Sequence, residues 1–168
     1  RYYKKRREVI FEKINQAKSQ KEKISVDTFP NNYYKLSDFA LVISKFWNEK
    51  TEENLTVALE GIFQQKLLPL ARKKRKDRSW INRFFAAQIF YYLPTEEDTK
   101  FIVKLVGDEV TLISIFAIKA AIKLGAYDAI HCVIKAIATR RKLSESIFIH
   151  CFKQANPKTR EHVIKVLN

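Results

Sequence analysis

The sequence predicts an all-α protein, arranged as an α-solenoid of about four helix pairs that follow a basic N-terminal helix. One observation is a repeat of 31 residues, in which segment 77–87 matches segment 108–118, and Lys104 then matches Lys135 without a gap. Another is that 168 residues contain only three glycines and four prolines, which favours long helices over hairpin-rich β structure. A repeat of this length with two helices per unit is typical of α-solenoids.

Residues 1–34 form the first predicted region, a basic helix followed by a loop. The apolar residues within 1–24 give one modest helical stripe, formed by Val9, Ile10, Phe11, Ile14 and Ala17. We expect this helix either to pack on the solenoid or to stand out as a stalk. Pro30 and the two asparagines after it predict a loop over 25–34.

Residues 35–168 form the second predicted region, which holds the helix pairs. A helix is expected from Ser37 to about Asn48, and Thr51 with the two acids after it predicts the start of the next helix. Pro69 predicts a kink or break in that helix near Leu68, because proline cannot donate a backbone hydrogen bond.

The repeat itself predicts the remaining helices. Thr95 and Asp108 are expected to cap helices, and Gly107 suits a helix C-terminus. The helix at 109–124 is apolar nearly all round, which indicates that neighbours cover it on several sides. The predicted helical ranges are 79–92, 96–106, 109–124, 128–138, 143–155 and 158–168.

Segment 77–138 resembles HEAT-like repeats, in particular the short bacterial form. The matching residues are Asp77, Asn82, Arg83, Ala86, Ala87 and Leu93, then Asp108, Ala117, Ala120, Leu124, Gly125, Asp128, Ala129, Ile130, Val133 and Ile134. Ser114 stands where the pattern has arginine, and Pro94 where it has glycine. The resemblance implies a right-handed stack of helix pairs, with a concave face lined by the second helix of each pair. It implies little about function.

The net charge of +14, from 32 basic and 18 acidic residues, predicts attraction to an anionic partner. Lys73, Lys104 and Lys135 are spaced by 31 residues, and Lys165 follows 30 residues later. If second helices line the concave face, these lysines form a ladder along a basic groove, joined by Lys100 and His131 at helical spacing. The alternative is that they are ordinary solvent-facing residues of repeat helices.

Two further patterns have a functional and a structural interpretation. The run 72–78 carries six positive charges and would be either an anion-binding patch or a solvated helix end; its candidate binding residues are Arg72, Lys73, Lys74 and Arg75. The second pattern is an aromatic-rich helix, for which we expect core packing rather than base stacking. Its aromatic residues are Trp80, Phe84, Phe85, Phe90, Tyr91 and Tyr92, with exposure of Tyr91 or Tyr92 left open.

Cysteine usage and the N-terminus suggest a location. Cys132 and Cys151 lie in apolar helical stretches without CxxC spacing, which predicts free thiols and a reducing, cytoplasmic compartment. The basic and aromatic cluster at 1–7 resembles the cytoplasmic flank of a membrane helix, so one expectation is a membrane tether before Arg1. The other is an ordinary charged first turn.

The sequence offers little support for catalysis, and we predict no enzyme activity, cofactor, metal or small-molecule substrate. His131, His150 and His162 are scattered, and no glycine-rich phosphate loop occurs. We expect a non-catalytic scaffolding or protein-binding domain of a longer protein, with a basic groove for an acidic protein partner. The alternative is a nucleic-acid-binding module. Its extreme form is a DNA glycosylase using Asp77 and Trp80, although Asp77 also stands where repeats place a capping aspartate.

Overall fold

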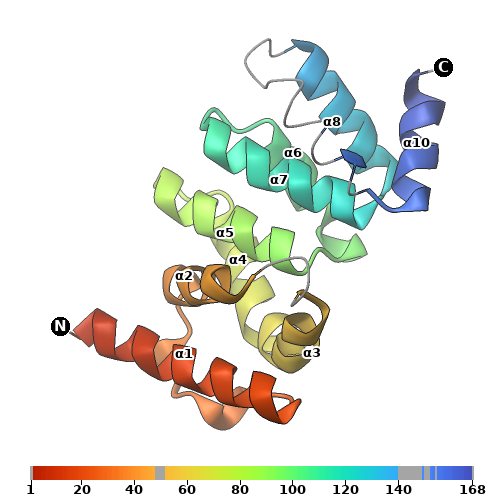
Figure 1. Ribbon diagram of the computed structural model, residues 1–168. Helices are drawn as coiled ribbons and strands as arrows, with labels where there is room; N and C mark the ends of the chain where they lie inside the picture. The colour runs from red at the N-terminus through yellow and green to blue at the C-terminus, as the bar shows by residue number, and fades with distance from the viewer. Residues whose placement is uncertain (1, 48–51, 140–148, 150–151, 154, 168) are drawn as a thin grey trace. The chain divides into compact units, whose positions relative to one another are not determined.

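Among the residues that the structure describes, all regular secondary structure is helical, so the predicted all-α class is confirmed. The computed structural model describes the chain apart from residues 1, 48–51, 140–148, 150–151, 154 and 168 (Figure 1). The chain divides into two compact units, Arg1–Lys74 and Arg75–Asn168, which are described separately below. The predicted region boundary after residue 34 stays a prediction.

The basic N-terminal helix, α1 (Tyr2–Gln20), packs within the first unit. It contacts α2 (Leu36–Phe46) and α3 (Glu52–Ile62), so it is docked and is not a free stalk. Its predicted apolar stripe is only partly buried, because Ile10, Ile14 and Ala17 lie in the core whereas Phe11 is exposed. The predicted loop that follows contains two 3₁₀ turns, Val26–Thr28 and Asn31–Tyr33.

A buried ion cluster holds α1 against α2. Arg6 and Arg7 both donate to the carboxylate of Asp38, and the side chains of Arg6 and Asp38 are 3% and 1% exposed. Neither arginine stood out in the sequence, because both lie in a dense run of cations. Arg6 and Arg7, two of the cations near the N-terminus, therefore have a structural role.

Pro69 lies in a helix that distorts without breaking. Residues Phe63–Leu67 form a π-helical turn between α3 and α4 (Leu68–Lys74). The N–H of Leu68 donates to the carbonyl of Phe63, five residues earlier. A widened turn removes the need for the hydrogen bond that proline cannot make, so the predicted irregularity near Leu68 is confirmed as a bulge directly before the proline.

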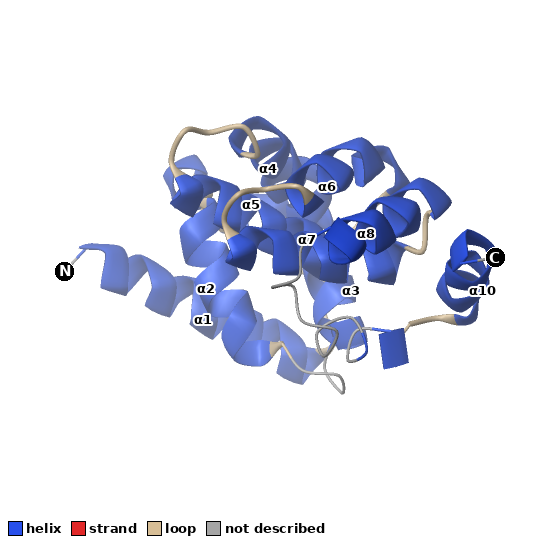
Figure 2. Ribbon diagram, turned by 90° about the horizontal axis from the view of Figure 1, so that it is seen from above, coloured by secondary structure: helices blue, strands red, loops and turns tan. Residues whose placement is uncertain are grey.

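The second unit contains two layers of helices (Figure 2). In one layer α5 (Trp80–Tyr92) packs against α7 (Thr111–Leu124), and in the other α6 (Thr99–Val106) packs against α8 (Tyr127–Thr139). Contacts of α6 with α7 join the layers, and α10 (Pro157–Leu167) packs on α8 and α7. Helix α7 therefore has neighbours on several sides, as its apolar sequence predicts.

The repeat is reproduced in the backbone hydrogen bonds. Oδ1 of Asp77 accepts from the N–H of Ser79 at 3.0 Å, and Oδ1 of Asp108 accepts from the N–H of Val110 at the same distance. The prediction that Asp108 caps a helix directly is wrong by two residues, because the capping position is Val110. The aspartates instead close the turn that precedes each helix, as Asx residues commonly do.

The helix predicted at 96–106 differs at its start, whereas Gly107 ends it as predicted. The hydroxyl of Thr95 donates to Oδ2 of Asp98 at 2.6 Å, and Glu96–Asp98 form a 3₁₀ turn, so α6 begins only at Thr99. Gly107 ends α6 with a φ of −84°, a conformation open to any residue. The predicted cap at Thr51 and most of the predicted 143–155 helix lie outside the described residues.

Gly125 makes the close junction between α7 and α10. It has a φ of +68°, and a Cβ atom there would lie 2.6 Å from Oγ1 of Thr159. That hydroxyl donates to the carbonyl of Ile122 at 2.9 Å, and Oδ1 of Asn156 accepts from the N–H of Thr159 at 2.8 Å. The sequence Asn-Pro thus starts α10 one residue earlier than predicted.

Candidate anion-binding surface

The second helices of the repeat carry four exposed basic side chains, which we call the basic face: Lys100, Lys104, His131 and Lys135. Because α6 packs alongside α8, the repeat-equivalent Lys104 and Lys135 lie on neighbouring helices. Neither makes an ion pair with any residue that the structure describes. Their charges are therefore available to an anionic partner.

The other two lysines of the predicted ladder differ from this pair. Lys165, on α10, is exposed but donates to Oε1 of Glu161 at 2.8 Å. This hydrogen bond raises the pKa of Lys165 and lowers the pKa of Glu161. Lys73 is exposed on α4 and belongs to the first unit. Within the second unit, the free charge of the ladder is thus concentrated on α6 and α8.

The basic run 72–78 spans the boundary between the units. Arg72 and Lys74 are half-buried in the last turn of α4, where both have interaction partners and where cations favour the helix dipole. This part of the run fits the structural interpretation. Arg75, Lys76 and Arg78 follow in the second unit, where Lys76 and Arg78 are exposed.

Arg75 joins the basic run to the basic face. Its guanidinium carbon lies 3.9 Å from the centroid of the Phe101 ring, and Nζ of Lys100 lies 5.1 Å from the same centroid. The Phe101 ring in turn stacks on the fully buried ring of Phe90, with 6.4 Å between centroids. Two patterns that the sequence presented separately therefore meet around one aromatic ring on α6.

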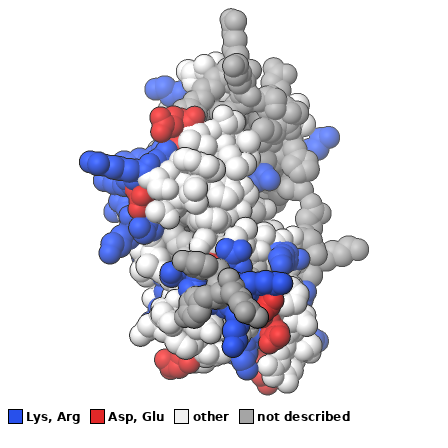
Figure 3. Space-filling model, turned by 90° about the vertical axis from the view of Figure 1, so that its left-hand side faces the viewer, with Lys and Arg blue, Asp and Glu red and all other residues white. Residues whose placement is uncertain are grey.

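Acidic side chains are interspersed with these cations. Glu97 precedes Lys100 by three residues, and Asp128 precedes His131 by the same spacing; both acids are exposed. Figure 3 shows a comparable mixture on one face of the molecule, where Lys and Arg gather with a few Asp and Glu beside a broad uncharged area. The surface is therefore basic in excess rather than uniformly positive.

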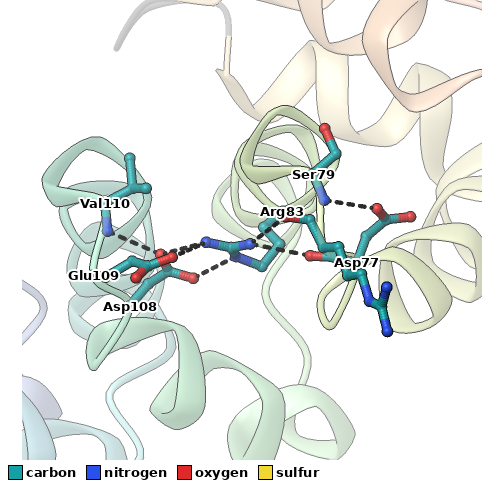
Figure 4. Close-up of polar contacts among 7 residues, drawn as sticks. Asp77, Ser79, Arg83, Asp108, Glu109 and Val110 are labelled. Atoms are coloured by element: carbon teal, nitrogen blue, oxygen red, sulfur yellow. Dashed lines mark hydrogen bonds and ion pairs between the residues drawn. The ribbon is translucent and has the colours of Figure 1, made fainter.

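Arg83 forms a network that belongs to the fold and not to the surface (Figure 4). It donates from Nε to Oδ2 of Asp108 at 2.8 Å, from Nη2 to Oε1 of Glu109 at 3.2 Å, and from Nη1 to the carbonyl of Asp77 at 3.0 Å. The hydrogen bond to Asp108 is the main cause that raises the pKa of Arg83. At the equivalent position, Ser114 donates to the carbonyl of Val106 at 2.6 Å instead.

The aromatic helix α5 is divided between core and surface. Phe90 and Tyr92 are buried, Tyr91 is half-buried, and Trp80 at the N-terminus of the helix is 48% exposed. The expectation of packing is thus not met for Trp80, which lies in the first turn of α5 beside the equally exposed Ile81. Oδ1 of Asp77 accepts a hydrogen bond from the N–H of Ser79, which is the role of a structural turn residue.

Tyr127 is a surface residue that the sequence reading did not identify. It is 46% exposed and stacks on His131 with 6.5 Å between ring centroids, and its ring makes a T-shaped contact with His162 at 5.5 Å. Tyr127 and His131 are four residues apart, a spacing that places two residues on the same face of a helix, and this could have identified the pair from the sequence. Nδ1 of His162 also lies 2.9 Å from the carbonyl of Gly125, which ties this aromatic cluster to the α7–α10 junction.

Cys132 is a half-buried free thiol, whereas Cys151 lies outside the described residues. Burial raises the pKa of Cys132, and its thiol contacts the carbonyl of Val103 at 3.7 Å.

Among described residues, no group of three or more His, Cys, Asp or Glu side chains is placed to hold a metal ion. In the same part of the chain, no helix is long and apolar enough to cross a membrane.

Comparisons with protein-family models, with curated proteins and with solved structures found no match for this chain.

Proposed function

We propose that this chain is a non-catalytic binding domain that holds an acidic segment of a protein partner on its basic face. The α5–α6 and α7–α8 pairs would be consecutive repeats of a right-handed, HEAT-like α-solenoid of about four pairs. Support for the repeat comes from the matched Asp77 and Asp108 turns and from the parallel packing of first and second helices in separate layers.

The observation that carries the proposal is the exposure of Lys104 and Lys135 on neighbouring helices without a carboxylate partner among the described residues. Lysines at equivalent positions of a repeat are regularly spaced, so they suit an extended ligand with several charges. Lysine acts as a flexible point charge, which tolerates variation in the position of each carboxylate.

An acidic peptide fits this surface better than a nucleic-acid backbone does. Glu97 and Asp128 are exposed one turn from Lys100 and His131, and they would repel a continuous row of phosphates. A peptide can place basic or polar groups opposite these acids. The exposed, stacked ring of Tyr127 adds an amphipathic contact of the kind that protein interfaces favour.

The test is the affinity of a labelled acidic peptide in which glutamates alternate with serines, measured by fluorescence anisotropy at low salt. Combining Lys104→Glu with Lys135→Glu should weaken binding by about tenfold or more, since each reversal replaces attraction by repulsion. The matched control combines Lys13→Glu with Lys158→Glu, two exposed lysines of α1 and α10, and carries the same net charge. Its affinity should change by less than about threefold.

Two outcomes would reject the proposal. One is equal weakening by both double variants, which would show that only total charge matters. The other is tighter binding of random-sequence duplex DNA than of the peptide, with a steep salt dependence that Lys104→Glu and Lys135→Glu reduce. That result would favour the nucleic-acid alternative.

A further inference from the structure

We infer that Arg75 is the specific carboxylate receptor of the basic face, held in place by the ring of Phe101. The inference rests on the proposed function, because it names the side chain that would recognise the acidic partner. It adds directional recognition to what would otherwise be attraction between flexible point charges. The partner group is the carboxylate of an Asp or Glu side chain in an acidic protein segment.

The ring of Phe101 holds the guanidinium of Arg75 in place. A separation of 3.9 Å between its guanidinium carbon and the Phe101 centroid places the cation directly on the ring face. Phe101 stacks on Phe90, whose side chain is fully buried, so the ring is anchored by the core. A guanidinium held in this way loses less conformational entropy on binding than a freely rotating one.

The guanidinium of Arg75 has unused hydrogen-bonding capacity. Nε of Arg75 is shielded from solvent and has no hydrogen-bond partner among the described residues. No described carboxylate forms an ion pair with Arg75 either, in contrast to Arg83, which meets both Asp108 and Glu109. Because Nε is shielded, an approaching carboxylate would bind through the terminal nitrogens of the guanidinium, which also have no acceptor among the described residues.

Two positive charges lie close to the Phe101 ring. Nζ of Lys100 lies 5.1 Å from the Phe101 centroid, so two cations share one aromatic side chain. Lys104 follows Lys100 by one helical turn and is also exposed. An anion bound at Arg75 would relieve the repulsion between these cations. Arg75 would provide the planar, two-pronged contact, while the lysines would attract neighbouring acids of the same segment.

The experiment compares two conservative substitutions in the same basic run. Arg75→Lys keeps the charge but removes the planar fork, whereas Arg78→Lys makes the same chemical change at an exposed arginine. The probe is the labelled peptide of alternating glutamate and serine, with random-sequence duplex DNA measured in parallel. We expect Arg75→Lys to weaken peptide binding by about fivefold or more and Arg78→Lys by less than about twofold. Unfolding curves in urea confirm that both variants are folded.

The results separate this inference from the proposed function. If Arg75→Lys and Arg78→Lys bind the peptide equally well, Arg75 is no receptor, even if Lys104→Glu and Lys135→Glu still weaken binding. If Arg75→Lys weakens only the binding of DNA, the stacked guanidinium contacts phosphates and the inference is overturned. A wild-type protein that does not bind the peptide at all would reject both the inference and the proposed function.

Discussion

Arg83 on α5 and Asp108 before α7 connect successive repeats by two hydrogen bonds, from Nε at 2.8 Å and from Nη2 at 3.2 Å. Both side chains are largely shielded, with exposures of 13% and 9%. Asp108 also accepts a hydrogen bond from the N–H of Val110. One carboxylate therefore binds Arg83 of α5 and also closes the turn before α7. Removal of this carboxylate therefore affects two parts of the fold at once.

Asp108→Asn should lower the free energy of unfolding by about 1–3 kcal/mol, because the Arg83 guanidinium loses a charged acceptor in a shielded site. Chemical unfolding in urea measures the change. Glu109→Gln is the matched control, since Glu109 accepts from the same arginine at 3.2 Å but is 84% exposed. It should cost less than about 0.5 kcal/mol. Equal losses in the two variants would contradict the assignment.

Asp38→Asn should lower the free energy of unfolding by about 3–5 kcal/mol, because it removes the carboxylate charge that pairs with the buried Arg6. Unfolding in urea again provides the measurement, and the fluorescence of Trp47 offers a probe in the same unit. For comparison, Glu60→Gln breaks the exposed ion pair with Lys23, whose two side chains are 55% and 67% exposed. That change should be close to neutral. A small effect of Asp38→Asn would show that the cluster contributes little.

Gly125→Ala should destabilise the protein by about 1–3 kcal/mol, since a Cβ atom at a φ of +68° is strained and would collide with the Thr159 hydroxyl. Gly107→Ala is the control: its φ is −84°, and the nearest atom to an added Cβ is 3.6 Å away. The control should be neutral or slightly stabilising, because alanine restricts the unfolded chain. Thermal unfolding followed by circular dichroism distinguishes the two. A neutral Gly125→Ala would mean that the junction adjusts easily.

Tyr92 should make stability fall at alkaline pH. Burial raises the pKa of its phenol above the ordinary value of 10.0, so the folded state holds the proton more tightly than the unfolded state does. The resulting stability is fully present below pH 10 and is lost as the pH rises from there towards the folded pKa. At pH 11 the loss from this group should be about 1.4 kcal/mol.

Tyr92→Phe removes this titration and leaves the other alkaline titrations unchanged. The measurement is the free energy of unfolding in urea at pH 8 and pH 11 for both proteins. The wild type should lose more stability over this interval than Tyr92→Phe does. Parallel losses would indicate that Tyr92 ionises in the folded protein as readily as in the unfolded chain.

The repeat period predicted the features that depend on local spacing. It predicted the all-helical class and the exposure of Lys104 and Lys135, because equivalent positions in successive units meet equivalent surroundings. The neighbours around α7 were predicted from the apolar sequence of that helix instead. The same local reasoning placed an irregularity near Leu68, because the chemistry of Pro69 demands one wherever the helix lies.

Features that depend on pairs distant in the chain were not predictable in this way. Arg75 and Phe101 are 26 residues apart and share no register, so only their three-dimensional placement shows that they stack. Trp80 was expected to pack because aromatic residues cover most faces of its helix. Its exposure depends on which elements lie beside the first turn of α5, and the spacing of residues along the chain does not give that.

The π-helical turn at Phe63–Leu67 has a consequence for sequence changes in this helix. One extra residue in a turn rotates everything after it by about 100° relative to a regular α-helix. Leu68 and Ala71 are fully buried in that rotated frame. Deleting a single residue such as Gln64 would therefore regularise the coil and keep both side chains on the buried side, whereas forcing all of the present residues into an ordinary α-helix would turn them towards water.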